Sequence, residues 1–471
     1  MNNNTIALPT KLSYGAGSIA SGVKDTAFNM FLLFFYTQVA GLSGALAGSA
    51  IFVALVLDAI SDPLVGFWSD RMNTAWGRRH PFIYASAMPM GAAFYFLFNP
   101  PMDASQSTLF IWMASFAILT RFFMTFFTVP STALTADMTS NYDERTSLSI
   151  FRVFLGWMGG IAFATIGYIV FFAPNDVFED GRLDPSAYHD FALTGAIAIV
   201  VAILVCAMGT HHLIPRLRNA AVEAKGSQGL RADFANIVGN KPFMTLALII
   251  FVSASCIGFT ESVGLYMYTY FWGLSSENLA VLTLTAALGT LIAFVTVPML
   301  SRKFDKKPVG IGAAALVMLI YPSLILLRIF DIMPADASVV LAALSFNAVI
   351  TVAAAVALTT VFVSMIADTT DKNELLTGQR QEAIYASAYT FSFKATSGLG
   401  GFLAGMVLQF VDFPTGAEAT DVAQETLNSL GSIVAVAIVC FWGFAILVFR
   451  KYSLSREEHE DIMKQLEARR A

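Results

Sequence analysis

The sequence predicts an all-α membrane protein with twelve transmembrane helices. The chain has 471 residues, of which 56% are hydrophobic and 13% are charged, and its mean hydropathy is +0.66. Soluble domains carry about 25% charged residues, so this composition indicates a chain surrounded by lipid. Apolar runs long enough to cross about 30 Å of hydrocarbon recur along the whole chain. The twelve runs cover residues 12–39, 45–69, 81–99, 108–136, 149–173, 191–214, 243–272, 277–300, 309–329, 338–367, 382–412 and 429–449.

The distribution of basic residues predicts the orientation. With a cytoplasmic N-terminus, 22 of the 28 Lys and Arg fall in cytoplasmic segments, four fall inside spans, and only Arg182 and Arg328 lie outside. The positive-inside rule therefore places both termini in the cytoplasm. The first residues lack the basic region and cleavage site of a secretory signal, so we expect the first span to be retained. The prediction is an integral protein of the plasma membrane, which is the inner membrane in a bacterium.

The longest cytoplasmic connection, residues 215–242, divides six spans in residues 1–214 from six in residues 243–450, and residues 451–471 form a tail. In the connection, LRADFANIV has helical apolar spacing, which is typical of an amphipathic helix on the membrane surface or of an ordinary surface helix.

The tail begins with a helix-capping pattern. Ser455 and Glu458 stand at capping-box spacing, which predicts a solvated helix to which we assign no function.

Charge and motif content exclude several classes of function. The net charge is −5 and no basic arm or stripe stands out, which argues against nucleic acid as a partner. Cys206, Cys256 and Cys440 all lie in apolar spans and the five histidines are scattered, so we expect no disulfide or metal framework. Nucleophile-elbow, phosphate-loop and histidine-rich signatures are missing from the sequence. We therefore expect neither an enzyme nor a cofactor.

Charged residues inside the predicted spans are the main functional signal. Each costs about 2.5 to 3.5 kcal/mol near the bilayer centre, so they must face one another or water. The eight residues are Lys24, Asp25, Asp58, Asp62, Arg121, Arg152, Glu261 and Lys394.

Asp58 and Asp62, in the stretch LDAISDPL, are four residues apart and share one helix face. At roughly 6 Å and an effective dielectric constant of about 20, two full charges repel by about 3 kcal/mol. Such a pair needs a cation, a proton or a neighbouring base, and Lys394 is the candidate base. A cation-coupled transporter would use this electrostatic conflict. The alternative is a static buried network that only fixes helix packing.

The other charged residues allow two interpretations each. Glu261 is either a satisfied packing residue or a proton or polar site. Structural pairing of Arg121 is favoured over contact with a substrate. Lys24 and Asp25 form either a self-neutralising pair or part of a substrate cavity. The aromatic run at residues 266–272 is predicted to be core and interface rather than a platform for sugar rings.

Four segments, in order and on the predicted spans, resemble one family. They are KLSYG with FYTQVAGLS, then LDAISDPLVGFWSDRMNTAWGRRHPF, then VPSTALTADMTSNYDERTSLSIFR, and finally MIADTTDKNELLTGQRQEAIYASAYTFSFK. The chain is identified by them as a member of the glycoside-pentoside-hexuronide:cation symporters, the melibiose permease-like family of the major facilitator superfamily. The resemblance implies two six-helix bundles around a central site that opens alternately to each side.

The resemblance also implies roles for individual residues. The family's cation site, for Na+, Li+ or H+, corresponds to Asp58, Asp62 and Thr125, and its sugar-contacting arginine corresponds to Arg152. The family's lysine and threonine of the eleventh span correspond to Lys394 and Thr390.

The segment GFWSDRMNTAWGRR resembles the cytoplasmic loop of the superfamily. Its glycine is expected to permit close helix approach, and its charged residues are expected to pair across the bundle interface when the inner gate closes. The alternative is that the arginines only enforce topology. The implied gating residues are Gly66, Asp70, Arg71, Arg78 and Arg79.

Two departures from the family bear on the substrate. The fourth-span aspartate that binds sugar corresponds to Thr128, and the first-span aspartate corresponds to Gly22, with Lys24 and Asp25 about one turn further on. These changes argue against galactoside binding in the melibiose manner. Arg152 with Lys394, by contrast, would suit a carboxylated sugar.

The sequence therefore predicts cation-coupled symport of a sugar, glycoside or uronide by a monomeric transporter. The alternative is a cation-coupled lysophospholipid transporter, since relatives of the family in animals carry such lipids. Asp58, Asp62 and Thr125 can form an oxygen cage for Na+, whereas the two carboxylates beside Lys394 also suffice for proton exchange. We favour sodium slightly.

Overall fold

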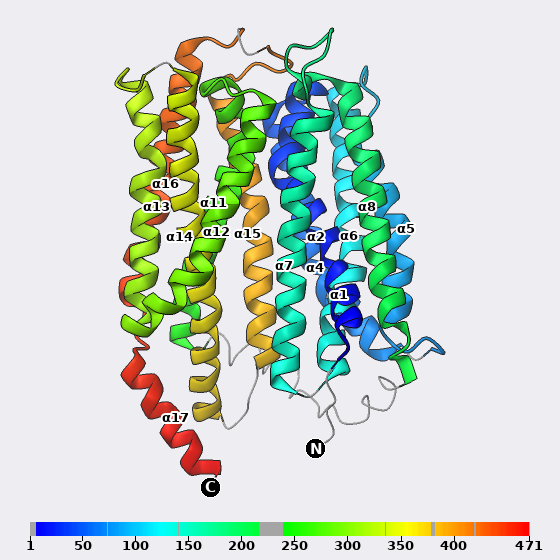
Figure 1. Cartoon of the computed structure of the whole chain (residues 1–471), viewed down its shortest axis with the longest axis vertical. Coiled ribbons are helices and arrows are strands. Elements are labelled where there is room, and N and C mark those ends of the chain that lie inside the picture. Colours follow the sequence, from blue (N-terminus) through cyan, green and yellow to red (C-terminus); the bar gives the residue numbers. More distant parts are fainter. Residues whose placement is uncertain are drawn as a thin grey trace.

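The computed structural model describes residues 6–470 except 73, 140, 216–238, 335, 378–381 and 419–420. In these ranges the chain forms helices and no strand. The helices stand side by side, with the first half of the chain on one side of Figure 1 and the second half on the other. The amphipathic helix predicted in LRADFANIV lies outside the described residues.

The first half contains the helices that correspond to the first six predicted spans. They are α1 (Leu8–Ala16), α2 (Ser18–Thr26), η1 (Ala27–Phe31), α3 (Leu32–Phe34), η2 (Phe35–Val39), α4 (Gly44–Arg71), α5 (His80–Leu97), α6 (Gln106–Met138), α7 (Tyr142–Ile166), η3 (Gly167–Phe171), η4 (Gly181–Leu183) and α8 (Pro185–His211). Of these, η1, η2 and η3 are π-helical and η4 is a 3-10 turn.

The second half contains the helices that correspond to the last six predicted spans, followed by the tail. They are α11 (Lys241–Tyr266), the π-helical η6 (Met267–Phe271), α12 (Ser276–Lys303), α13 (Lys306–Ile329), α14 (Ala337–Thr377), α15 (Glu382–Phe410), α16 (Gln424–Lys451) and α17 (Arg456–Arg470).

Every predicted span coincides with a helical segment, so the all-α prediction is confirmed. The ends differ by a few residues, and the largest difference is α14, which continues to Thr377 although the prediction ended at residue 367. The first span is divided, because π-helical turns alternate with α-helix in it. By length and apolarity, nine helices within the described ranges can cross a membrane.

Helix packing defines two six-helix bundles. In the first half, α4 and α5 pack on α6, α8 packs on α5, and α7 packs on α2. In the second half, α12 and α13 pack on α14, and α16 packs on α13 and α11. The halves meet at three contacts: α4 packs on α15, η1 contacts α11, and α12 contacts α7. The α4–α15 contact is close because it contains glycines: a Cβ added at Gly405 would lie 2.3 Å from the carbonyl oxygen of Gly44.

An internal repeat relates the two bundles. Two similar segments, YTQVAGLS at 36–43 and YTYFWGLS at 268–275, each begin within the π-helical turn that ends a span. Gly41 and Gly273 both have positive φ, 74° and 66°, which a glycine adopts without strain. Each motif is followed directly by a long helix, α4 or α12. The first and seventh spans therefore end in the same way, as expected for structural repeats.

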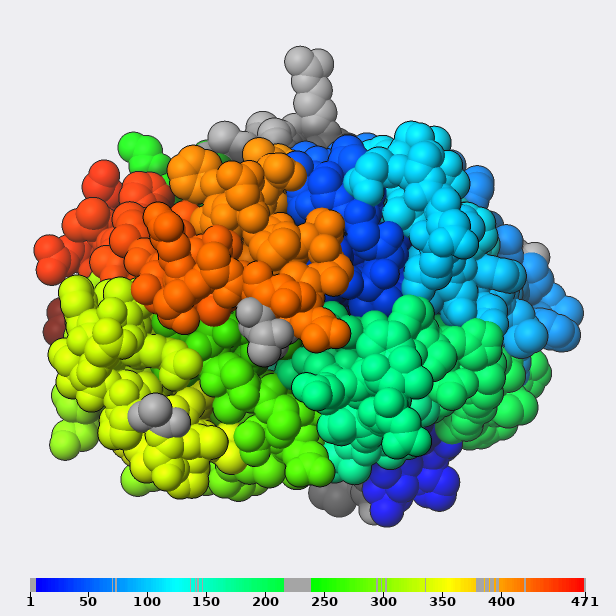
Figure 2. Space-filling view, turned by 90° about the horizontal axis from the view of Figure 1, so that it is seen from above, coloured from blue at the N-terminus to red at the C-terminus, as the bar shows by residue number. Residues whose placement is uncertain are grey.

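The repeated motifs also touch each other. The hydroxyl of Tyr270 donates to Gln38 Oε1 at 3.0 Å, and the hydroxyls of Thr37 and Tyr266 are hydrogen-bonded. Arg182 Nη2 donates to the carbonyl oxygen of Leu274 at 2.8 Å. These contacts join the halves at the end of the bundle opposite the chain termini (Figure 1), the face seen in Figure 2.

The tail helix α17 docks on the bundle. Ser455 Oγ accepts from the backbone N–H of Glu458 at 3.2 Å, which confirms the predicted cap. The prediction of a solvated helix is wrong in part, because Ile462 and Leu466 are buried where α17 packs on α14. The apolar side chains at i and i+4 supply one buried stripe on an otherwise polar helix.

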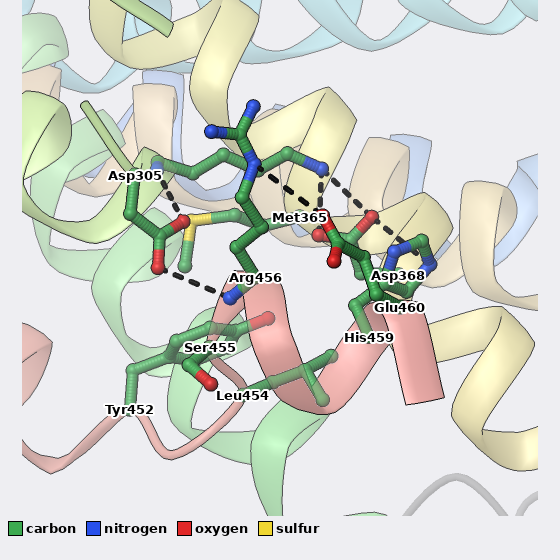
Figure 3. A pocket seen from close by; sticks show the side chains of 10 residues that line it. Asp305, Met365, Asp368, Tyr452, Leu454, Ser455, Arg456, His459 and Glu460 are labelled. Atoms are coloured by element: carbon green, nitrogen blue, oxygen red, sulfur yellow. Dashed lines mark hydrogen bonds and ion pairs between the residues drawn. The ribbon is translucent and has the colours of Figure 1, made fainter. Parts of the chain in front are cut away.

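Charged side chains flank a cavity of about 200 Å³ under the start of α17. His459 Nε2 lies 3.1 Å from Asp371 Oδ2 and 3.5 Å from Asp368 Oδ1, and the backbone N–H of Arg456 donates to Asp305 (Figure 3). Lys306 Nζ lies 2.6 Å from Asp368 Oδ2. The tail is thus held to α13 and α14 by polar as well as apolar contacts.

Candidate transport site

The two carboxylates of α4 lie on one helix face, as their spacing predicts. Both reach Thr125 of α6: its Oγ1 lies 2.9 Å from Asp58 Oδ1 and 2.8 Å from Asp62 Oδ1. α4 runs through Pro63 without ending, because packing on α6 and α15 supports it. Three oxygens of the predicted cation site therefore converge at one point.

Thr125 cannot donate to both carboxylates, since a hydroxyl carries one proton. One of the two short oxygen–oxygen contacts is a hydrogen bond donated by Thr125. At the other contact, the Thr125 oxygen can share a proton or a cation with the second carboxylate. The arrangement is therefore suited to hold one positive charge from solution.

Arg121 is a second partner of the acid pair. Its Nη1 donates to Asp58 Oδ2 at 3.2 Å, and the two side chains are 6% and 5% exposed. The guanidinium carbon lies 5.0 Å from the ring centre of Phe28 on the first span. The favoured interpretation of Arg121 as a pairing residue agrees with this geometry.

Lys394 brings the opposite half of the molecule to the acids. Its Nζ lies 2.9 Å from Asp62 Oδ2 and 3.8 Å from Asp58 Oδ2. Lys394 is 30% and Asp62 is 20% exposed, so this pair is more open than the Asp58 pair. Arg121 and Lys394 together carry two positive charges, and Asp58 and Asp62 carry two negative charges. The four side chains are therefore neutral as a group without a bound ion.

A second polar group lies between the first span and α11. Lys24 and Asp25 are ion-paired, and Lys24 Nζ lies 5.7 Å from the ring centre of Phe28. Glu261 on α11 is exposed, with Asn29 within hydrogen-bonding reach and Asp25 close enough to interact electrostatically. Because these residues lie on segments that meet between the halves, we place them at the interface.

Arg152 belongs to a separate polar cluster. Its Nη1 donates to the Thr132 hydroxyl at 2.9 Å and to the Tyr14 hydroxyl at 3.2 Å, and its Nε donates to Ser18 Oγ at 3.4 Å. Thr128 lies on the same face of α6, one turn before Thr132. Arg152 is thus surrounded by hydroxyl groups at the α1–α6–α7 contact.

The structure explains why position 22 is not an aspartate. A Cβ added at Gly22 would lie 2.0 Å from the carbonyl oxygen of Gly156, because α2 and α7 pack backbone to backbone there. The carboxylate of this span is instead Asp25, which is exposed. The glycine at position 22, where the resembling family has an aspartate, therefore has a steric basis.

The predicted gating segment differs from expectation at Gly66, and its expected pairing across the interface when the inner gate closes stays a prediction. Gly66 does not mark a close helix approach, since a Cβ there would lie 3.7 Å from Val129 Cγ1, an ordinary contact distance. Arg78 and Arg79 pair with Asp137 of α6, at 2.6 Å and 3.4 Å, and hence within their own bundle.

Arg71 lies over the ring of Phe67, 3.6 Å from its centre. The side chains of Asp70 and Thr390 lie outside the described part of the structure.

Sequence reasoning missed Asn29, Tyr14 and Thr132 as members of these clusters. A signal was present in the spacing: Arg121, Thr125, Thr128 and Thr132 follow one another by four, three and four residues. That is the period of one helix face, so α6 presents a continuous polar stripe. Reading the stripe as a unit would have added Thr132.

Comparison with known proteins identifies the family. A family model described as MFS/sugar transport protein matches residues 13–456. A putative glycoside/cation symporter of Escherichia coli, YagG, is 26% identical over 99% of this chain and 96% of its own length. A sodium-dependent lysophosphatidylcholine symporter of Danio rerio is 26% identical over 97% of this chain and 88% of its own.

The fold has a solved counterpart. The inward open conformation of the xylose transporter XylE from E. coli matches with a TM-score of 0.62 at 15% identity, over 96% of this chain and 98% of that one. With the family model, this likeness confirms the major facilitator fold. Since the family model spans nearly the whole chain, the chain is an integral membrane transporter and not an enzyme, and it belongs to the MFS/sugar transport family.

Proposed function

We propose that this chain carries a sugar, glycoside or uronide together with a monovalent cation, by alternating access of a central site. The observation that carries the proposal is the ion pair between Lys394 and Asp62, because it joins the two halves. When the halves rearrange, the pair must separate. A carboxylate left unpaired at membrane depth costs several kcal/mol, so a cation from solution takes the place of Lys394.

The coupling cation, Na+ or H+, is held in this proposal by Asp58, Asp62 and Thr125. Their converging oxygens support either ion, since a carboxylate can accept a proton and oxygen ligands suit Na+. No other cofactor is proposed.

The sugar is bound in this proposal by groups on both sides of the acid pair. Arg152 with Thr128 and Thr390 would contact it from the two bundles, and Lys24, Asp25 and Glu261 would accept or donate to its hydroxyls. Positive charge at Arg152 and Lys394 favours a substrate with a carboxylate. The name of the E. coli relative, a putative glycoside/cation symporter, supports the same class of substrate.

With both termini in the cytoplasm, as the basic residues predict, the contacts of Gln38 with Tyr270 and Thr37 with Tyr266 close the outer end. The arrangement then corresponds to an inward-facing state of a monomer in a bacterial inner membrane.

A second candidate substrate is a lysophospholipid. The observation that favours it is the similarity to the lysophosphatidylcholine symporter of Danio rerio.

The test is uptake into proteoliposomes that contain the purified full chain. The probes are a radiolabelled glucoside, a glucuronide and a lysophosphatidylcholine, each with a Na+ gradient, a pH gradient or neither. The proposal expects accumulation of one of the two sugars above equilibrium only under an ion gradient. Accumulation of the lysolipid alone would favour the second candidate, and equilibration without regard to ions would contradict coupled symport.

A further inference from the structure

The acid pair on α4 could hold two cations, yet one carboxylate already has a fixed cation beside it. Arg121 Nη1 lies 3.2 Å from Asp58 Oδ2. Arg121 keeps its charge at every physiological pH and is among the side chains best suited to buried ion pairs. It occupies the place at Asp58 that a solution cation would take.

Lys394 Nζ lies 3.8 Å from Asp58 Oδ2, but it is closer to Asp62 Oδ2, at 2.9 Å. The shorter contact of each acid, Asp58 with Arg121 and Asp62 with Lys394, is anchored in a different way. Asp58 on α4 and Arg121 on α6 both belong to the first bundle, and these helices pack directly on each other. The Asp58 pair therefore moves as one unit when the bundles rearrange. Asp62 is paired with Lys394 of the second bundle, so rearrangement of the bundles separates this pair.

Burial separates the two pairs in the same way. The side chains of Arg121 and Asp58 are 6% and 5% exposed, whereas those of Lys394 and Asp62 are 30% and 20% exposed. A cation from solution reaches the more exposed pair without first displacing a buried guanidinium.

We infer that Arg121 is a built-in counter-ion of Asp58, and that the chain accepts its coupling cation at Asp62 alone. The inference rests on the proposed symport, and it adds that one cation binds per chain. Thr125 completes the site, because its oxygen lies 2.8 Å from Asp62 Oδ1 and can share a proton or a metal cation with it. Arg121 is a specificity-determining residue that sets the number of ions by filling the second position.

The inference predicts a gain of binding when the fixed charge is removed. In R121Q, Asp58 remains buried and loses its nearest counter-ion, and Lys394 alone, 3.8 Å away, cannot neutralise both acids, so the pair recruits a second cation from solution. In R121K, a positive charge stays beside Asp58, and the number of bound cations remains that of the wild type. In D62N, the exchangeable carboxylate of the pair is gone, and the pair binds no cation although Asp58 is intact.

The experiment counts cations on the purified full chain in detergent. Radioactive Na+ is measured by equilibrium dialysis, with choline keeping the ionic strength constant. Proton uptake per chain is measured for each protein with a pH-indicator dye, for the case in which the site takes H+. The variants are R121Q, R121K, D62N and the double variant D62N/R121Q.

The expected counts are one cation for wild type and R121K, two for R121Q, none for D62N and one for D62N/R121Q. Equal counts in R121Q and wild type, or one cation bound to D62N, would overturn the inference. Should R121Q fail to fold, the D62N count still decides, because Asp58 is then the one carboxylate of the pair that is left to hold an ion.

The two proposals fail in different ways. If the wild type binds neither Na+ nor an additional proton and R121Q binds one cation, symport is contradicted and the role of Arg121 stays intact. One cation on both wild type and D62N contradicts the role of Arg121 and leaves symport intact.

Discussion

Lys394 Nζ lies 2.9 Å from Asp62 Oδ2, although 332 residues separate the two in the chain. The pair ties α15 of the second bundle to α4 of the first at the depth of the membrane. A bond of this kind holds only while the bundles keep their present arrangement. The position of Lys394 therefore links the charge state of Asp62 to the conformation of the whole transporter.

Arg152→Gln should weaken substrate binding. Arg152 is held by Thr132 and Tyr14, so its guanidinium is already positioned to donate two hydrogen bonds to a ligand. We expect an apparent affinity at least about tenfold lower, a loss of about 1.4 kcal/mol, in glycoside or glucuronide uptake. The matched control is Arg145→Gln on the exposed start of the same helix, which should leave the affinity unchanged.

Gly22→Ala should destabilise the first bundle. The added Cβ would meet the Gly156 carbonyl oxygen at 2.0 Å, and the two helices would have to move apart. Overpacking of this kind costs about 1 to 3 kcal/mol. The apparent melting temperature in detergent should fall, whereas Gly312→Ala, whose Cβ would meet nothing within 4 Å, should leave it unchanged. Equal melting temperatures for the two variants would contradict the close α2–α7 contact.

Ile462→Asp with Leu466→Asp should undock α17. Both side chains are buried, and burial of each is worth about 1.5 to 3 kcal/mol. We expect trypsin to cleave the tail faster in this variant than in wild type. Lys464→Glu, on the exposed side of the same helix, is the control. It removes the trypsin site at Lys464, and the other sites in its tail should be cleaved at the wild-type rate. Identical cleavage of all three proteins would indicate that the tail is not docked.

Glu144 should contribute to stability in a pH-dependent way. A hydrogen bond from Lys11 holds the pKa of the Glu144 carboxyl below its usual value, with a further bond from the backbone of Ile6. A carboxyl group whose pKa is lower in the folded than in the unfolded state stabilises the fold when the pH is above its unfolded pKa of about 4.3. This stabilisation is lost as the pH falls through the pKa of the folded state.

The melting temperature of the wild type should therefore exceed that of Glu144→Gln at neutral pH, and the difference should shrink below a pH of about 4.3. A difference that does not change with pH would assign the effect to packing instead. Lys11→Gln should reproduce the loss, since it removes the same hydrogen bond.

The fold could be predicted from the sequence because apolar runs of membrane length are a strong, local signal. The twelve runs depend only on composition and length, and each coincides with a helix. The π-helical turns of η1 and η6 could not be predicted, since they depend on how the first and seventh spans meet the opposite bundle. Docking of α17 was missed because only Ile462 and Leu466 distinguish it from a solvated helix.

The candidate site was predictable in part. The spacing of Asp58 and Asp62 alone places them on one face, their need for a neighbouring base indicated Lys394, and the resemblance supplied Thr125. Spacing could not reveal that Arg121 lies on Asp58, because this contact depends on the rotation of α6 against α4.

The contacts of the charged loop after α4 could not be predicted for this arrangement, because a motif carries no information on conformation. The motif predicts pairing across the interface when the inner gate closes, and in this arrangement Arg78 and Arg79 contact Asp137 of their own bundle.

The central claim is that a solution cation replaces Lys394 at Asp62 during transport. The most direct measurement is accumulation of a radiolabelled glucoside or glucuronide by proteoliposomes of wild type and Asp62→Asn under an imposed Na+ or pH gradient. The account predicts that wild type concentrates the sugar above its outside level and that Asp62→Asn, inserted in equal amount, never exceeds equilibrium. Gradient-driven accumulation by Asp62→Asn at the wild-type level would contradict it.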